Sequence, residues 1–71
     1  MSSRVTKVVY DAGVHVMTID TTINEILEVQ FSVTEQVWMV KHYVSTGNGR
    51  KRVRITTIPA RQLRFMEEWA P

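Results

Sequence analysis

The sequence predicts a mainly β fold, a β-rich α+β chain with five antiparallel strands in meander order and a short C-terminal helix. Three observations support this prediction: Asn48-Gly49 between two β-branched runs, a second turn signal at Gly13, and strict apolar–polar alternation before Thr34. Asn-Gly flanked by such runs is the strongest short-range hairpin signal. Five short strands in this order suggest a small SH3-like or OB-like barrel, or an open sheet covered by the helix.

The first expected hairpin joins residues 4–10 to residues 14–19 through Asp11-Ala12-Gly13. A three-residue loop closed by a glycine with positive φ suits this tripeptide. Both faces of the hairpin are partly apolar, which is typical of a barrel interior or of an interface. One face is therefore expected to pair with a second copy in a homodimer. That face comprises Val5, Val9, Met17 and Ile19.

Residues 20–36 carry two competing patterns. Thr22 and Glu25 form a capping box, the usual mark of a helix start. Residues 27–33 alternate strictly between apolar and polar side chains, the pattern of a half-buried strand. We expect a strand at 26–33, with one helical turn at 22–25 before it and a short turn at 34–36 after it.

The longest expected hairpin, residues 37–58, divides its side chains between two faces. A two-residue turn at Asn48-Gly49 and a four-residue turn at 46–49 give the same division, because strand side chains alternate with period two. A three-residue loop would exchange the faces of one strand. The expected core face carries Trp38, Val40, His42, Val44, Val53, Ile55 and Thr57. The expected outer face carries Met39, Lys41, Tyr43, Ser45, Arg50, Arg52, Arg54 and Thr56.

Residues 60–69, which follow Pro59, predict the C-terminal helix. Proline suits the first helical position, and most of the residues after it are good helix formers. The alternative is a single 3₁₀ turn followed by a short strand at 63–66.

Length and composition limit the class of protein. The chain has 71 residues and no cysteine, so we expect one domain, residues 1–71, without a disulfide framework or a thiolate zinc site. The N-terminal residues lack a secretory apolar core, and no apolar run approaches the about 20 residues that span a membrane. We expect a soluble cytoplasmic protein that does not associate with a membrane.

Charge is distributed unevenly along the chain. Residues 1–40 carry two basic and five acidic side chains, a net charge of −3, whereas residues 41–71 carry seven basic and two acidic side chains, a net charge of +5. Such asymmetry indicates an anionic partner. The simpler interpretation is that one small surface carries both signs of charge, because solvated charges cost little.

The basic face of the long hairpin is the expected binding site. Arginines at alternate positions of one strand lie about 7 Å apart. They repel one another, and a row of phosphates would relieve that repulsion. The ring of Tyr43 is expected to stack on a base. The residues expected to bind nucleic acid are Lys41, Tyr43, Arg50, Lys51, Arg52 and Arg54. The alternative is a solvated hairpin that its charge protects from aggregation.

A second hypothesis is a small regulator or inhibitor that docks on an acidic surface of a larger protein. Aromatic residues, methionine and arginine are enriched at such interfaces. The possible partner patch comprises Arg61, Arg64, Phe65 and Trp69. The competing interpretation is that the aromatic members of this patch close the core.

The sequence contains no catalytic or metal-binding motif that we recognise. No serine lies in a Gly-x-Ser-x-Gly context, and Glu67 and Glu68 are adjacent, so that on a helix they diverge. His15 and His42 are far apart and lack nearby cysteine or patterned carboxylate, whereas a metal site needs three or four ligands. We expect a non-enzymatic binding module with no cofactor and no metal.

Overall fold

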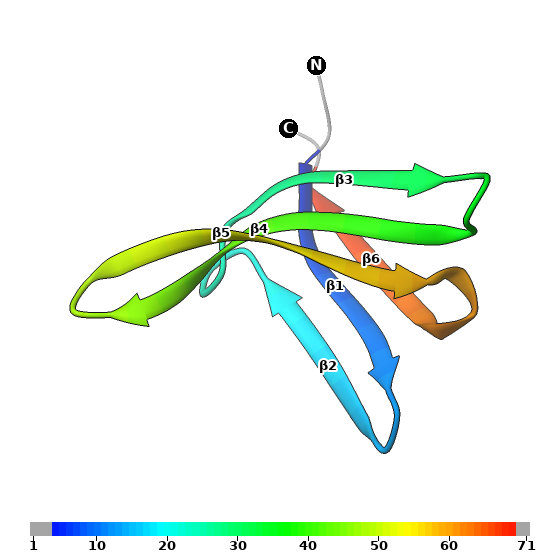
Figure 1. Ribbon diagram of the computed structural model, residues 1–71, viewed down its shortest axis with the longest axis horizontal. Coiled ribbons are helices and arrows are strands. Elements are labelled where there is room, and N and C mark those ends of the chain that lie inside the picture. The colour runs from blue at the N-terminus through cyan, green and yellow to red at the C-terminus, as the bar shows by residue number, and fades with distance from the viewer. Residues whose placement is uncertain (1–3, 70–71) are drawn as a thin grey trace.

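The computed structural model describes residues 4–69, and strands dominate that range (Figure 1). The strands are β1 (Arg4–Ala12), β2 (His15–Asp20), β3 (Ile26–Ser32), β4 (Val37–Gly47), β5 (Arg50–Pro59) and β6 (Leu63–Trp69). They form two three-stranded antiparallel sheets, with strand orders β2-β1-β6 and β3-β4-β5. The mainly β prediction is confirmed. The five-stranded meander is not, because the described chain has a sixth strand and β6 returns to β1.

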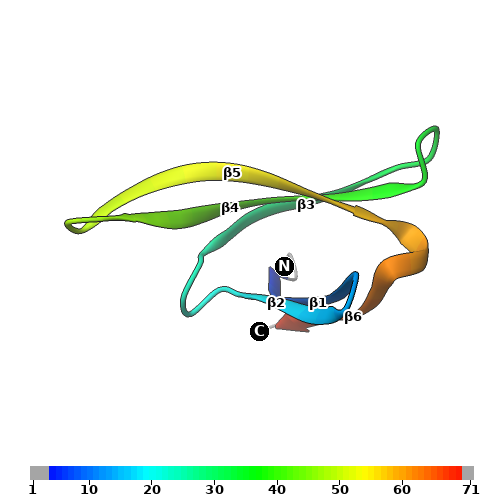
Figure 2. The same cartoon turned by 60° about the horizontal axis from the view of Figure 1, so that its bottom comes forward.

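The two sheets face each other across one small core (Figure 2). The chain passes between them twice, through residues 21–25 after β2 and through the 3₁₀ turn Ala60–Gln62 after β5. The core cluster consists of Val8 and Ile19 from one sheet with Ile26, Val40 and Ile58 from the other. All five are β-branched, and such side chains pack well on a pleated surface. This cluster therefore joins the two sheets.

A strand stands where the sequence predicts the C-terminal helix. Pro59 precedes the 3₁₀ turn, and β6 then pairs with β1 along its length. Leu63 and Met66 pack against the core from this strand. Helix propensity is a weak preference, and the pairing of β6 with the edge of β1 outweighs it here. The alternative prediction, a 3₁₀ turn followed by a strand, is confirmed, and the strand continues to Trp69.

The first hairpin has a tighter loop than the sequence predicts. Ala12 pairs with His15, so the loop is Gly13-Val14, with Gly13 at φ 73°. The three-residue loop expected at 11–13 is wrong, and so is the pairing register between the two strands that this loop implies. Val8 now lies opposite Ile19, and both are buried in the core.

Three of the four residues expected to form a dimer face are buried or packed within the chain. Ile19 lies in the core, and Val9 is 7% exposed beside its cross-strand partner Phe65. Val5 packs against the core cluster, which leaves Met17 as the exposed member of that set. The observed register also places Val9 on the side of the sheet opposite Ile19, so the four residues do not form one face.

Residues 21–25 form no helix, but a single turn closes on the carbonyl of Asp20, two residues before the helical turn that the sequence predicts at 22–25. The strand predicted at 26–33 is confirmed as β3. The capping group is Asp20 and not Thr22. Oδ1 of Asp20 accepts hydrogen bonds from the backbone N–H of Thr22 at 2.9 Å and from its hydroxyl at 2.7 Å. The Asp20 carbonyl accepts from the N–H groups of Ile23 and Asn24. This is the hydrogen bonding of a helix N-cap, but only one turn forms before β3 begins.

These hydrogen bonds predict a dependence of stability on acid. The N–H of Thr22, then its hydroxyl, and then the charge of Lys7 lower the pKa of Asp20 below 3.8. A carboxyl whose pKa is lower in the folded state stabilises that state above its unfolded pKa, and this contribution is lost as pH falls through the folded pKa. The free energy of unfolding of the wild type should decline as pH drops below about 4, and Asp20→Asn should decline less steeply.

Urea denaturation at a series of acidic pH values measures this difference. Glu35→Gln, which neutralises an exposed carboxylate in another turn, is the matched control. A parallel decline in Asp20→Asn and the wild type would show that this turn does not sense acid.

Candidate functional site

The turn of the β4–β5 hairpin is the Asn48-Gly49 turn that the sequence predicts. Its two residues have φ of 53° and 72°, as a type I′ turn requires. Just before it, Thr46 has no cross-strand partner, because Ser45 pairs with Lys51 and Gly47 with Arg50. Thr46 is thus the extra residue of a β-bulge, and the pairing register shifts by one residue through the rest of the hairpin.

This shift divides the predicted basic face. Val44 pairs with Arg52 and His42 with Arg54. Because paired residues share a face, both arginines lie on the side of the sheet that faces the core. Lys41 pairs with Ile55 on the opposite side. The prediction of one basic face that includes Lys41, Arg52 and Arg54 is therefore wrong.

The same shift corrects the predicted core. Val53 and Ile55 lie on the outer side of the β3-β4-β5 sheet and are 45% and 61% exposed. Ile58 takes their place, fully buried. Val40 is buried as predicted, and Trp38 and Val44 are half-buried.

The imidazole of His42 accounts for part of the observed register. This side chain is 3% exposed, with Nε2 2.7 Å from the Thr56 hydroxyl and Nδ1 3.1 Å from the carbonyl oxygen of Tyr43. Because a carbonyl can only accept, Nδ1 donates, and Nε2 accepts from the Thr56 hydroxyl. The register that pairs Val40 with Thr56 thus satisfies a buried polar ring and buries Ile58.

We expect His42→Ala to lower the free energy of unfolding by about 2–4 kcal/mol, because it opens a cavity and removes the partner of the Thr56 hydroxyl. Thr56→Val, which keeps the side-chain shape, should cost about 1–2 kcal/mol by leaving Nε2 without its donor. Urea denaturation of both single variants and the double variant measures the coupling. Losses that simply add would contradict the hydrogen bond between these side chains.

The end of the β4–β5 hairpin projects beyond the rest of its sheet (Figure 1). Pairing between β3 and β4 stops at His42, so the hairpin is a two-stranded ribbon from Tyr43 onward. We call residues 43–54 the arm. The backbone N–H of Tyr43 donates to the carbonyl of Glu25 at 3.0 Å, which ties the base of the arm to the loop before β3.

The arm is the most basic part of the chain. Its cationic residues are Arg50, Lys51, Arg52 and Arg54. All four are exposed, and residues 43–54 contain no acidic side chain. The ion pairs of the described residues are Arg4–Glu25, Lys7–Asp20 and Arg64–Asp11. Within residues 4–69, therefore, no carboxylate neutralises the arm.

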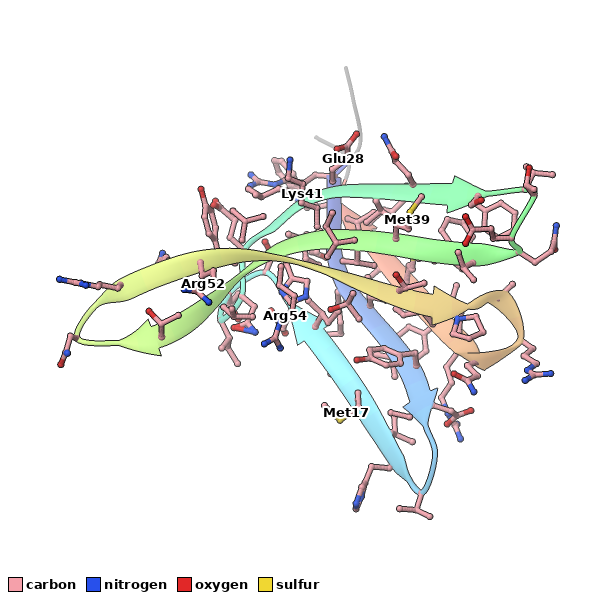
Figure 3. The ribbon with its side chains drawn as sticks, in the orientation of Figure 1. Met17, Glu28, Met39, Lys41, Arg52 and Arg54 are labelled. Atoms are coloured by element: carbon pink, nitrogen blue, oxygen red, sulfur yellow. The ribbon has the colours of Figure 1, made fainter. Side chains whose placement is uncertain are left out.

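Both faces of the arm carry positive charge. Lys51 lies on the outer face, where its Nζ is 5.8 Å from the centre of the Tyr43 ring. Arg52 and Arg54 lie on the inner face, and Figure 3 labels both along β5. The half-buried Tyr43 ring thus already has a cation beside it, in place of the open stacking surface that the sequence predicts.

Lys41 lies in a different setting from the arm arginines. It borders a shallow hollow of about 150 Å³ on the outer side of the β3-β4-β5 sheet. The other residues that line this hollow are Glu28, Gln30, Met39 and Ile55. Figure 3 shows Glu28, Lys41 and Met39 together where β3 runs beside β4.

The residues of the predicted partner patch do not lie together in the structure. Phe65 and Trp69 lie on the outer side of β6, 49% and 60% exposed. Nε of Arg64 donates to Oδ1 of Asp11 at 2.7 Å. Arg61 lies on the 3₁₀ turn, where it borders the same hollow as Glu35. The structure brings the two aromatic residues to one face of the sheet and leaves Arg61 apart from them.

The described residues define a small mainly β protein whose unpaired positive charge gathers on a two-stranded arm. Among residues 4–69, no group of three histidine or carboxylate side chains is arranged to hold a metal ion. The same part of the chain contains no helix with the length and apolarity to cross a membrane. Comparisons with protein-family models, curated proteins and solved structures returned no match to this chain.

Proposed function

We propose that this protein binds nucleic acid by inserting its arm, residues 43–54, between the two backbones of a duplex. The observation that carries this proposal is the presence of exposed cations on both faces of one ribbon, with no acidic side chain on it. A single basic face suits one phosphate backbone, whereas a ribbon that is basic on both faces suits the two walls of a groove.

The dimensions of the arm support this proposal. The major groove of B-DNA, about 12 Å wide, admits a two-stranded β-ribbon. The major groove of A-form RNA is deep and narrow and excludes it. Duplex DNA is therefore the favoured ligand, with Lys51 on one wall, Arg52 and Arg54 on the other, and Arg50 at the tip.

Salt-dependent binding to duplex DNA tests the proposal. Affinity should fall linearly with the logarithm of salt concentration between about 50 and 200 mM, by about one slope unit per phosphate contact. Lys51→Ala and Arg52→Ala remove neighbouring cations from opposite faces, and each should reduce the slope by about one. If only one of the two variants changes the slope, the arm lies along a single backbone and does not enter a groove.

Single-stranded DNA and duplex RNA of the same length complete the experiment. Weaker binding to both is expected, because neither offers a wide groove between two backbones. No binding to any of the three probes at low salt would refute the proposal. It would favour the alternative that charge on the arm only prevents edge-to-edge aggregation.

A second candidate function is docking on a larger protein, and the exposure of Phe65 and Trp69 on β6 favours it. Large aromatic side chains often anchor interfaces. A pull-down from the source cell, carried out with and without nuclease, separates the two functions. A stoichiometric protein partner that survives nuclease and is lost in Phe65→Ala/Trp69→Ala would favour docking.

The finer fold prediction also remains a proposal. A small SH3-like or OB-like barrel is supported by β1, which pairs with both β2 and β6, and by the two crossings of the chain between the sheets. Small barrels of this kind present loops and hairpins around one core, which suits a projecting binding arm.

A further inference from the structure

The outer side of the β3-β4-β5 sheet carries an apolar surface that the proposed function does not use. Met39 on β4 and Ile55 on β5 both line the hollow, and Ile55 lies directly opposite Lys41. Ile55 is 61% exposed, so its apolar side chain is open to solvent beside the base of the arm. At about 150 Å³ the hollow is smaller than the roughly 300–1,000 Å³ of small-molecule pockets. A flat macromolecular surface suits it better than a small ligand.

Two opposite charges border this apolar surface. Glu28 on β3 lies directly opposite Lys41 on β4, and both are exposed. Oε1 of Glu28 accepts a hydrogen bond from Gln30 at 2.7 Å. Within residues 4–69, neither Glu28 nor Lys41 takes part in any of the ion pairs, including one with the other. Both charges remain available to a partner.

We propose that the occupant of this surface is a second copy of the same chain, related by a two-fold axis. A two-fold interface brings the same patch together from both copies, so the patch must complement itself. A patch with one carboxylate, one ammonium group and an apolar floor meets this condition, because Lys41 of each protomer can reach Glu28 of the other. A uniformly acidic partner would place carboxylates opposite Glu28, and a uniformly basic partner would place cations opposite Lys41.

Sedimentation of the wild type tests the dimer directly, and it does not depend on nucleic acid. We expect a monomer–dimer equilibrium at micromolar concentrations. Lys41→Glu alone and Glu28→Lys alone should each weaken self-association by about a hundredfold, because both symmetry-related pairs become pairs of like charge. Circular dichroism of each variant checks that the fold is kept.

Mixing the two variants is the decisive step. In the mixed dimer, both pairs regain opposite charges, so association should return to within about threefold of the wild type. A fault in folding cannot produce this recovery, because each variant would carry the fault into the mixture. A wild type that sediments as a monomer throughout, or a mixture that stays monomeric, would overturn the proposal.

Discussion

Replacing Arg52 and Arg54 together by glutamate is expected to reduce binding to duplex DNA by at least about a hundredfold at low salt. The substitutions remove two phosphate contacts and place two carboxylates against the same backbone. Both side chains are exposed, and no described carboxylate pairs with either. The fold should therefore survive, and fluorescence anisotropy with a labelled duplex measures the loss.

The control must change charge equally at another place. Arg4→Glu/Arg61→Glu does so, because both residues are exposed and lie outside the arm. Arg4→Glu replaces an exposed ion pair with Glu25 at 3.5 Å by two exposed like charges, and charge pairs at exposed positions have a small effect on stability. This control should retain most of the affinity. Equal losses in the two double variants would mean that net charge, and not the arm, attracts the duplex.

Local patterns predicted those parts of the fold that neighbouring residues decide. The alternation over 27–33 specified a strand, β3, although Leu27 and Phe31 on its apolar side remain exposed. Asn48-Gly49 specified its turn, because both residues accept positive φ at low cost. The exposed cations of the arm were likewise identified from the sequence, although not the faces on which they lie.

Features that depend on distant residues were not predictable in the same way. The bulge at Thr46 reversed the faces of β5, and Gly47 at φ 92° is the one local sign of it. The apolar residues of β5 could not correct the error. Ile55 and Ile58 are three residues apart, so their side chains lie on opposite faces of the strand. Either register therefore places one isoleucine in the core. The choice depends on His42, whose ring needs the Thr56 hydroxyl across the sheet.

The replacement of the C-terminal helix by β6 has a similar cause. Residues 60–69 are good helix formers when considered alone. In the fold, β1 offers them a strand edge, and Met66 pairs opposite Val8 at the core. Burial of apolar surface at that edge outweighs a propensity of a few tenths of a kcal/mol per residue.

Ile58→Ala should lower the free energy of unfolding by about 3 kcal/mol. Ile58 is fully buried where the two sheets meet, and the surrounding core is too small to fill the cavity. A domain of this size has a total stability of about 4–10 kcal/mol. The variant should unfold at a markedly lower urea concentration than the wild type.

Ile55→Ala is the matched control, because it makes the same chemical change on the same strand. Ile55 is 61% exposed on the opposite face, so its loss should cost less than about 1 kcal/mol. Both variants should be unfolded in urea at two protein concentrations, because a contribution from self-association would change the midpoint with concentration. In the register without the bulge, Ile55 would face the core and Ile58 would face solvent. A larger loss in Ile55→Ala than in Ile58→Ala would thus support the register without the bulge. In that register the arginines share one face, which would contradict a ribbon charged on both sides.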